Sequence, residues 1–374
     1  MKIRAAVLHE MNLPAPYKDS QPLRIETLDL DPPQMGEVLI RIRATGLCHS
    51  DLSVINGSRP RPVPMALGHE AAGEVVEVGP GVTDLRPGDH VVCAFVPSCG
   101  HCLPCREGRP ALCEPGAAAN GAGTLLSGER RLHKDGADIH HHLGISGFAE
   151  YAVVARNSLV KVDPDVPFEE VALFGCAVMT GVGAVVNTAR VPVGSTVAVV
   201  GLGGVGLSAI LGARVAGARR IIAVDVNPAK LKTALELGAT DAFDARDPEV
   251  TQQIREATEG GVEYAFETAG VVPAMQTAIA ITRRGGTTVT AGLPHPDHHL
   301  SFPQLLLAAE ERTIKGSYVG SCVPARDIPR FIELYKQGRL PVNRLLTDRL
   351  RLEDINEGFD RLDRGEVSRL VVTM

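Results

Sequence analysis

The sequence predicts an α/β protein with two domains: a β-rich, barrel-like domain, and a second domain built on a doubly wound parallel sheet. Three observations lead to this prediction. The chain has 374 residues, and domains of roughly 100–200 residues make two the natural number. Short β-branched runs separated by Gly- and Pro-rich turns fill residues 1–177. Apolar strand runs that alternate with helical stretches fill residues 178–319.

The strands expected in the first part are short and bounded by turns. They include VLIRIRATG at 38–46, GEVVEVG at 73–79 and HVVCAF at 90–95, with the turn RPGD at 86–89. Many short strands with irregular connections are typical of a small barrel.

In the second part, predicted strands alternate with predicted helices. Strand-like runs lie within 196–226, 261–270 and 285–294, and the stretch NPAKLKTALELG at 227–238 is helical in pattern. Residues 320–374 contain two more helical stretches and end on the strand-like SRLVVTM. This tail has no obvious core of its own, so we expect it to pack on an earlier domain.

Composition excludes several classes of function. Hydrophobic residues make up 44% of the chain and charged residues 22%, as in globular proteins, and the net charge of −6 offers no basic surface for nucleic acid or an anionic membrane. No apolar run approaches the roughly 18 residues of a membrane span, and MKIRAAVLHE is not a signal peptide. We therefore expect a cytoplasmic protein, in which the eight cysteines serve a purpose other than structural disulfides.

Four of these cysteines fall within fifteen residues, in CGHCLPCREGRPALC. Tetrahedral zinc takes four thiolates at about 2.3 Å, and short gaps let neighbouring thiols converge on one ion. An iron–sulfur cluster uses four cysteines at similar spacings and is not excluded by them. A site with four protein ligands is closed, which favours a structural role. The four residues are Cys99, Cys102, Cys105 and Cys113.

A second candidate metal set is dispersed along the chain. Cys48, His69 and Cys176 would make a three-ligand zinc site with an open fourth position, as catalysis needs, but spacing alone does not select them. Asp51 and Glu70 are neighbours of two of these residues. They are either carboxylates that orient the ligands or ordinary surface residues.

A glycine-rich turn indicates nucleotide binding. Gly201, Gly203 and Gly206 form GxGxxG between the strand STVAVV and a helix, and Asp225 ends the next strand, RIIAVD. The glycines allow the pyrophosphate to approach the helix N-terminus. Asp225 can accept bonds from ribose hydroxyls and would repel a 2′-phosphate, which favours NAD over NADP. A tight turn without a ligand is the alternative interpretation.

With these parts in place, the chain resembles the zinc-dependent medium-chain alcohol dehydrogenases of the liver type, which include the glutathione-dependent formaldehyde dehydrogenases. The resemblance covers essentially the whole chain. It is carried by GHEAAGEVVEVGPGV (68–82), the four-cysteine loop, GLGGVG, IHHHLGISGFAEYAVV (139–154), INEGFD (355–360) and the final SRLVV.

The resemblance implies a domain plan. A GroES-like catalytic domain would span 1–177, with a structural zinc lobe at about 97–115, and would be completed by 320–374. A Rossmann domain at 178–319 would bind NAD. Each chain would hold two zinc ions, of which only the one on Cys48, His69 and Cys176 does chemistry.

The resemblance also assigns roles by position. Asp51 and Glu70 match the carboxylates behind the catalytic zinc, and Ser50 matches the hydroxyl that starts a proton relay. Phe95 matches a wall of the substrate pocket, and Leu293 lies near its inner end. The implied coenzyme contacts are His49, Thr180, Gly201, Gly203, Gly204, Val205, Gly206, Asp225, Lys230, Ala291, Leu293 and Arg369.

Two positions depart from the family pattern. Many liver-type enzymes have a histidine three residues after the relay hydroxyl, where this chain has Ser53, so the relay would end through water. The glutathione-dependent branch has an arginine four residues after the last lobe cysteine, where this chain has Ala117. That difference argues against S-(hydroxymethyl)glutathione as the substrate.

Some reactive side chains receive no functional role. The family has a similar His-rich segment that binds no metal, so His140, His141 and His142 are assigned to loop packing. Cys93 and Cys322 lack a surrounding motif and are interpreted as ordinary thiols.

The expected function is reversible oxidation of alcohols to aldehydes or ketones, with hydride transfer to NAD. A polyol dehydrogenase is the rival within the class, although many of those lack the four-cysteine loop. A non-catalytic nucleotide-binding relative is the rival outside it, but such a protein would be expected to lose a catalytic zinc ligand. Residues 117–145 resemble the longer loop of dimeric relatives, so we expect a homodimer that pairs near 295–319. The sequence does not specify the alcohol.

Overall fold

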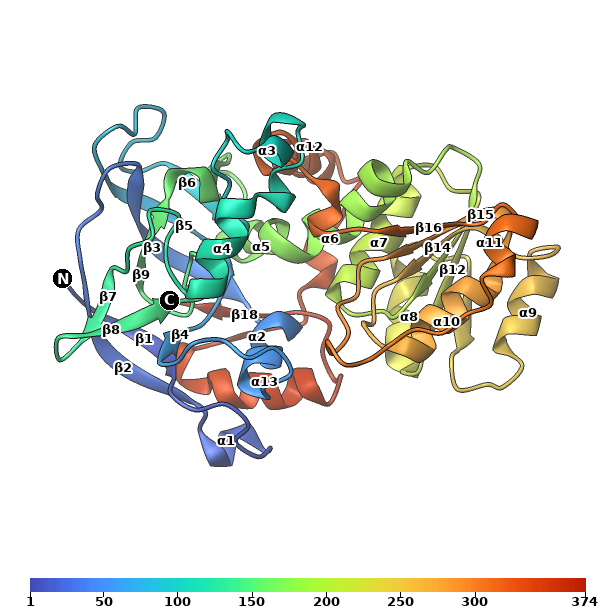
Figure 1. The fold of residues 1–374 in the computed structure, drawn as a ribbon, viewed down its shortest axis with the longest axis horizontal. Helices are drawn as coiled ribbons and strands as arrows, with labels where there is room; N and C mark the ends of the chain where they lie inside the picture. Colours follow the sequence, from blue (N-terminus) through green and yellow to red (C-terminus); the bar gives the residue numbers. More distant parts are fainter. The chain divides into compact units, whose positions relative to one another are not determined.

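The computed structural model describes residues 1–374, which divide into two compact units. The first unit comprises Met1–Cys176, Val323–Phe331 and Leu346–Met374, and the second comprises Ala177–Cys322 and Ile332–Leu345. Figure 1 labels the helices and strands of both units in sequence colours.

A closed five-stranded barrel forms part of the first unit. In β1, Ile3 and Val7 enter one apolar cluster while Ala6 and Leu8 enter another, because successive side chains point to opposite faces of a strand. In order around the barrel, the strands are β1 (Lys2–Leu8), β2 (Leu23–Leu30), β7 (Leu132–Lys134), β8 (Ala137–His141) and β4 (Met65–Ala66).

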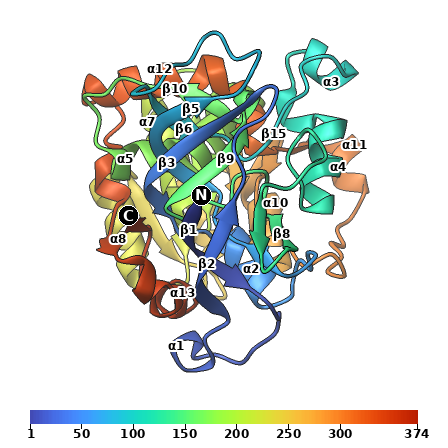
Figure 2. The ribbon, with the colours of Figure 1, turned by 90° about the vertical axis from the view of Figure 1, so that its left-hand side faces the viewer.

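A second sheet completes the strands of this unit, which face the viewer in Figure 2. The runs expected at 38–46, 73–79 and 90–95 are confirmed as strands β3, β5 and β6. The C-terminal strand pairs antiparallel with β3, so the chain end contributes to the first unit. The order is β10 (Leu159–Lys161), β6 (His90–Cys93), β5 (Glu70–Val78), β3 (Glu37–Gly46), β18 (Leu370–Thr373) and β17 (Asp348–Leu350), with β9 (Tyr151–Ala155) also on β3.

The helices of the first unit are short, and the C-terminal one is the clearest example of an amphipathic helix. Its buried residues Ile355, Phe359 and Leu362 share one face and join the apolar cluster that contains Leu52 and Ile55. The helices are α1 (Tyr17–Ser20), α2 (His49–Ile55), α3 (Leu103–Arg106), α4 (Glu114–Ala122), α5 (Phe168–Leu173) and α13 (Ile355–Asp363).

The second unit is built on a six-stranded, wholly parallel sheet, which confirms the predicted doubly wound architecture. The strand order is β13 (Asp241–Asp244), β12 (Arg220–Asp225), β11 (Thr196–Val200), β14 (Val262–Glu267), β15 (Thr282–Thr290) and β16 (Thr313–Gly316). Helices α7 (Gly204–Val215), α8 (Pro228–Leu237), α9 (Val250–Ala257) and α10 (Val272–Ile281) pack on this sheet (Figure 1). Two short helices, α6 (Met179–Gly183) and α11 (Leu305–Ala309), complete this unit.

Local chemistry explains where these helices begin and end. In α8, the Asn227 side chain accepts the Ala229 N–H at 2.9 Å, and Pro228 occupies the first helical position. Gly238 ends the helix with a left-handed φ of 118°.

The expected C-terminal segment 320–374 is divided between the units. Helix α12 (Pro324–Lys336) begins in the first unit and ends in the second, and residues 332–345 belong to the second. The physical reason is local: the Arg344 side chain donates to the Glu236 carbonyl at 2.9 Å, and Leu340 and Val342 are fully buried.

One helical run corrects the expectation that no segment reaches the length of a membrane span. Phe168–Ala189 has 22 residues with a mean hydropathy of 1.7, and 83% of its most apolar window is buried inside the protein. The core helix of a globular protein can have the same length and composition, so this run is only weak evidence of a membrane span.

Candidate metal centres and coenzyme loop

The pairing of two strands brings the dispersed metal set together. Cys48 follows β3 and His69 precedes β5, and these strands run antiparallel with Gly46 opposite Glu70. Cys176 lies in a π-helical turn, Phe174–Val178, that follows α5. Because these segments converge from three directions, the two thiols and the imidazole are all buried.

The donor atoms of this buried centre are close together. The Cys48 and Cys176 sulfurs are 4.0 Å apart, and one donor atom from each of Cys48, His69, Glu70 and Cys176 lies within 4.8 Å of the others. His69 Nε2 and Glu70 Oε1 are buried without a hydrogen-bond partner. The structure therefore unites the three ligands predicted from the sequence and places Glu70 beside them.

These side chains fit a zinc ion. An unpartnered buried polar atom costs about 1–3 kcal/mol, and a cation would satisfy the free lone pair of His69 Nε2. Two sulfurs and an imidazole are the donors that zinc prefers. A hydrogen bond from Cys176, helped by His69, lowers the pKa of the Cys48 thiol, so the pair readily supplies its first thiolate.

Two buried carboxylates lie behind the donors. Asp51 Oδ2 is 3.1 Å from His69 Nδ1, and Asp51 Oδ1 accepts the Gly68 N–H at 3.0 Å. Glu70 Oε2 accepts from Arg369 Nη1 at 3.3 Å, but burial outweighs this cation and raises the pKa of Glu70 to about 7. The structure thus places both of the predicted carboxylates and Arg369 at this centre.

A glycine is required next to the imidazole ligand. Gly68 has a φ of +93°, and a Cβ there would lie 2.4 Å from the backbone nitrogen of Phe148. Only glycine avoids that collision and the strain of a left-handed backbone.

One predicted pocket residue of this unit, Phe95, contacts the centre, and another, Ser50, follows its ligand Cys48 in the chain. The Phe95 ring packs edge-on against the His69 ring at 5.1 Å between centroids. Ser50 lies in the first turn of α2, directly after His49. The Ser53 hydroxyl donates to the His49 carbonyl at 2.8 Å, so it is engaged within its own helix.

The four-cysteine loop forms a second, closed set. One sulfur from each of Cys99, Cys102, Cys105 and Cys113 lies within 4.8 Å of the others, and all eight cysteines of the chain are free of disulfides. Backbone N–H groups point at the sulfurs: Cys99 donates to Cys113 at 3.2 Å and Cys102 donates to Cys99 at 3.3 Å. Backbone N–H groups, chiefly that of His101, lower the pKa of Cys99 to about 6, which favours the thiolate that a metal requires.

The glycine-rich turn of the second unit has the geometry of a nucleotide loop. β11 ends at Val200, Gly201 has a φ of +93°, and α7 begins at Gly204. A Cβ on Gly206 would lie 1.9 Å from the Gly201 carbonyl oxygen, so helix and loop approach as closely as glycine permits.

Asp225 ends β12 beside this loop. Its carboxylate accepts the Leu202 N–H at 2.6 Å and the Asn227 N–H at 2.8 Å, which fixes the loop before any ligand binds. Among the other predicted contacts, Lys230 lies in α8, Thr180 lies in α6, and Ala291 and Leu293 follow β15.

Sequence reasoning missed two residues that shape this loop. Glu267 is buried and accepts the Gly270 N–H at 2.6 Å and the Thr290 hydroxyl at 2.8 Å, so it ties the ends of β14 and β15 together. The Thr268 hydroxyl donates to the Gly201 carbonyl at 2.6 Å. Both lie within the predicted strand run 261–270: Glu267 is the last residue of β14, and Thr268 comes directly after it. Their place at the carboxyl end of a predicted strand is the signal that could have identified them.

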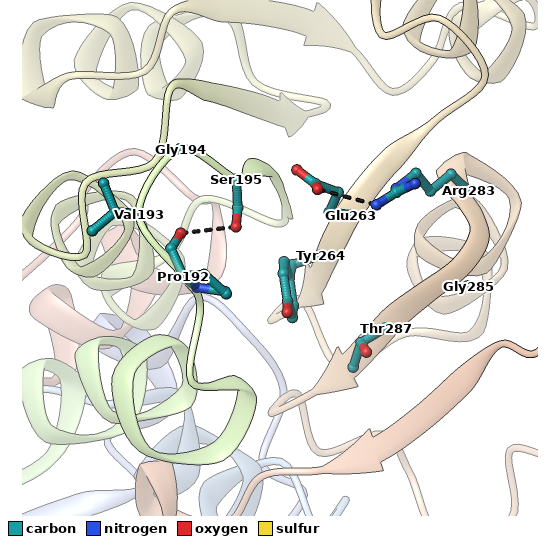
Figure 3. Close-up of a pocket in the computed structure, with 9 residues that line it drawn as sticks. All are labelled: Pro192, Val193, Gly194, Ser195, Glu263, Tyr264, Arg283, Gly285 and Thr287. Carbon is teal, nitrogen blue, oxygen red and sulfur yellow. Dashed lines mark hydrogen bonds and ion pairs between the residues drawn. The ribbon is translucent and has the colours of Figure 1, made fainter.

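A hollow of about 210 Å³ lies elsewhere in the second unit (Figure 3). It lies at the amino ends of β11 and β14, whereas the glycine-rich loop follows the carboxyl end of β11. Glu263 pairs with Arg283 across it at 3.1 Å. Its charges are therefore satisfied, and it takes no part in the candidate site.

Comparison with known proteins agrees with this geometry. Residues 34–164 match the family model for the alcohol dehydrogenase GroES-like domain, and residues 204–337 match that for zinc-binding dehydrogenases. An S-(hydroxymethyl)glutathione dehydrogenase from Synechocystis sp. is 40% identical over 376 residues, covering 100% of both chains.

Solved structures extend the comparison. An alcohol dehydrogenase zinc-binding domain protein from Burkholderia ambifaria superposes with a TM-score of 0.94 at 38% identity, covering 100% of this chain and 99% of that one. A benzyl alcohol dehydrogenase from Acinetobacter calcoaceticus superposes with a TM-score of 0.93 at 33% identity, with the same coverage. The chain belongs to the zinc-binding medium-chain alcohol dehydrogenase family. It is a zinc-dependent oxidoreductase with small-molecule alcohol or aldehyde substrates and a nicotinamide coenzyme.

We predict two zinc ions per chain, held independently. Cys102→Ser removes a ligand from the closed set and should lower the melting temperature, because structural zinc contributes folding free energy directly. Cys176→Ser should leave a folded protein with one zinc. Elemental analysis and thermal unfolding measure both effects. Stoichiometric iron, or a Cys176→Ser protein that retains two zinc ions, would contradict the assignment.

Proposed function

We propose that this chain catalyses the reversible oxidation of alcohols to aldehydes or ketones with hydride transfer to NAD. The observation that best supports this proposal is the buried set of Cys48, His69 and Cys176, in which His69 Nε2 has no hydrogen-bond partner. A non-catalytic relative would not need to preserve three converging ligands around an unsatisfied nitrogen. The closed four-cysteine set, which many polyol dehydrogenases lack, favours an alcohol dehydrogenase within the class.

When bound, zinc supplies Lewis acidity toward the substrate oxygen, and NAD supplies the hydride acceptor. Asp51 holds the His69 ring through Nδ1, which turns Nε2 toward the two sulfurs. Phe95 packs edge-on against the His69 ring and bounds the space beside it. Ser50 accepts the proton of the substrate hydroxyl as it passes its own proton on toward water, because a hydroxyl both accepts and donates hydrogen bonds.

The preference for NAD is proposed from Asp225. Its carboxylate is already anchored by two backbone N–H groups, so it presents a fixed negative charge at the loop. That charge accepts ribose hydroxyls and repels a 2′-phosphate. The remaining proposed coenzyme contacts are His49, Thr180, Gly201, Gly203, Gly204, Val205, Gly206, Lys230, Ala291, Leu293 and Arg369.

The names of the relatives suggest two substrate types, S-(hydroxymethyl)glutathione and benzyl alcohol. Ala117, exposed on α4, offers no positive charge for the glutathione carboxylate. We therefore propose a small alcohol, not the glutathione conjugate, as the substrate.

The substrate prediction is tested by following NADH formation with the purified protein. Primary, secondary and aromatic alcohols should include substrates with a higher kcat/KM than S-(hydroxymethyl)glutathione, because the chain lacks a cation at position 117. A preference for the glutathione conjugate would reverse this proposal, and no turnover of any alcohol would sink the proposed function.

The domain roles, assembly and compartment are part of the same proposal. Residues 1–177 and the parts of 320–374 that lie in the first unit would hold the metals and substrate, and 178–319 the coenzyme. β16 is the edge strand of the parallel sheet, and an open edge suits pairing with a second copy near 295–319. Light scattering distinguishes this cytoplasmic homodimer from a monomer or tetramer.

Replacing Asp225 should shift the coenzyme preference. Asp225→Asn keeps an oxygen acceptor of similar reach for the loop but removes the charge, and Asp225→Ser removes the charge and leaves only a shorter hydroxyl acceptor. Each should raise the ratio of kcat/KM with NADP to that with NAD by at least roughly tenfold, about 1.4 kcal/mol. Steady-state kinetics with both coenzymes measure the ratio. A native enzyme that uses both equally would contradict the role of Asp225.

We predict that the rate of the chemical step depends on the Ser50 hydroxyl and not on the Ser53 hydroxyl. Positioned proton transfer is worth about 10²–10⁴-fold, so Ser50→Ala should slow the chemical step on that scale while zinc content and NAD binding persist. Ser50→Thr should retain most activity. Ser53→Ala should change little, since that hydroxyl is bonded to the His49 carbonyl. Single-turnover rates measure these effects, and a native rate in Ser50→Ala would end the relay idea.

A further inference from the structure

We propose that His142 is a positioning residue of the metal centre: it anchors the Asp51 carboxylate and thereby fixes the His69 ring. The inference rests on the zinc centre proposed above, and it gives His142 a role that loop packing does not cover.

The geometry places one carboxylate between two imidazoles. Asp51 Oδ1 is 3.0 Å from His142 Nδ1, and Asp51 Oδ2 is 3.1 Å from His69 Nδ1. Both are ion-pair distances, although the N–H directions lie outside ideal hydrogen-bond geometry. The two rings stand nearly perpendicular, with centroids 5.5 Å apart. Asp51 and His69 are fully buried, and His142 is 2% exposed.

The backbone around His142 is held in place. Its N–H donates to the Ser146 hydroxyl at 3.1 Å, and its carbonyl accepts the N–H groups of Ile145 at 3.0 Å and Ser146 at 3.2 Å. Leu143 and Ser146 adopt left-handed φ values of 52° and 57°, which are uncommon outside glycine. The turn after β8 therefore sets where the imidazole lies.

The neighbouring histidines do not share this contact. His140 Nδ1 accepts from Arg130 Nε at 3.1 Å, and His141 Nε2 accepts the Arg131 N–H at 3.1 Å. His142 alone of the three reaches the Asp51 carboxylate.

The consequence for the metal centre is mechanical. Without His142, Asp51 Oδ1 would keep only the Gly68 N–H, and the carboxylate could pivot about that bond. With a partner on each oxygen, the carboxylate plane is fixed and His69 Nδ1 stays turned toward it. Groups that orient a metal ligand in this way typically change metal affinity 10–100-fold.

A metal-ligand role for His142 is the competing interpretation. One donor atom from each of Asp51, His69 and His142 lies within 4.8 Å of the others. However, Asp51 already accepts the Gly68 N–H, and His69 belongs to the sulfur set. A positioning role for His142 is compatible with all of these contacts. A third metal ion on Asp51, His69 and His142 would instead take His69 away from the two sulfurs.

The test measures how fast zinc leaves the protein in excess chelator. His142→Phe keeps a ring but removes the donor, and should release zinc from the Cys48–His69–Cys176 set about 10–100-fold faster than the native chain. His142→Asn, whose amide nitrogen takes the place of Nδ1, should stay within about threefold of native. His141→Gln is the matched control, a buried neighbour that does not touch Asp51, and should match native.

Zinc in the closed cysteine set is the internal reference. Its release is measured in proteins that also carry Cys176→Ser, which hold only that zinc ion. The rate of this release should be the same with and without each His142 or His141 substitution. If His142→Phe does not fold, His142→Gln replaces it, because its amide lies at the Nε2 position and should also release zinc quickly. Thermal unfolding of each variant separates loss of fold from loss of zinc.

Unchanged release in His142→Phe would overturn the inference, as would equally fast release in His142→Asn, which would make ring packing the cause. Three zinc ions in the native chain, falling to two in His142→Phe, would make His142 a ligand and also overturn it. A native chain with no zinc beyond the closed cysteine set would instead sink the proposed function.

Discussion

The antiparallel pairing of β3 with β5 is the constraint on which the metal centre depends. Because Gly46 lies opposite Glu70, the residues that leave β3 and enter β5 meet at one end of the sheet. Cys48 and His69 thereby become neighbours although they are distant along the chain. A one-residue slip in this register would turn every side chain of the strand to the other face and separate the thiol from the imidazole.

Burial then sets the electrostatics of the centre. Asp51 and Glu70 have no exposed surface, and an isolated buried carboxylate would be expensive. Each has a polar partner: Asp51 accepts the Gly68 N–H and lies between His69 and His142, and Glu70 accepts from Arg369. Pairs of this kind are weak evidence for stability, because desolvation offsets their attraction. Their value here is orientation, since each carboxylate holds a side chain that faces the candidate metal position.

The coenzyme loop of the second unit is also held by carboxylates, which here accept backbone N–H groups. Asp225 ends β12 and Glu267 ends β14, the two strands that flank β11. Asp225 accepts the N–H groups of Leu202 and Asn227, and Glu267 accepts that of Gly270. Parallel strands present their carboxyl ends at one edge, so these anchors surround the glycine-rich turn. The loop is thus ordered before a ligand arrives, which lowers the entropy cost of binding.

Features that depend on short stretches were determined by the sequence itself. The four cysteines of the closed set, the GxGxxG turn and the helical stretch 227–238 each lie within about fifteen residues, so a local pattern predicts them. The dispersed ligands Cys48, His69 and Cys176 needed family resemblance, because no local pattern relates residues joined by strand pairing. Only the tertiary structure decided that residues 332–345 join the second unit, that Ser53 bonds within its own helix, and that His142 alone among three adjacent histidines reaches Asp51. The physical reason is the same in each case: a side chain's partner is set by long-range packing and by the turn that directs it, and adjacent residues can point in different directions.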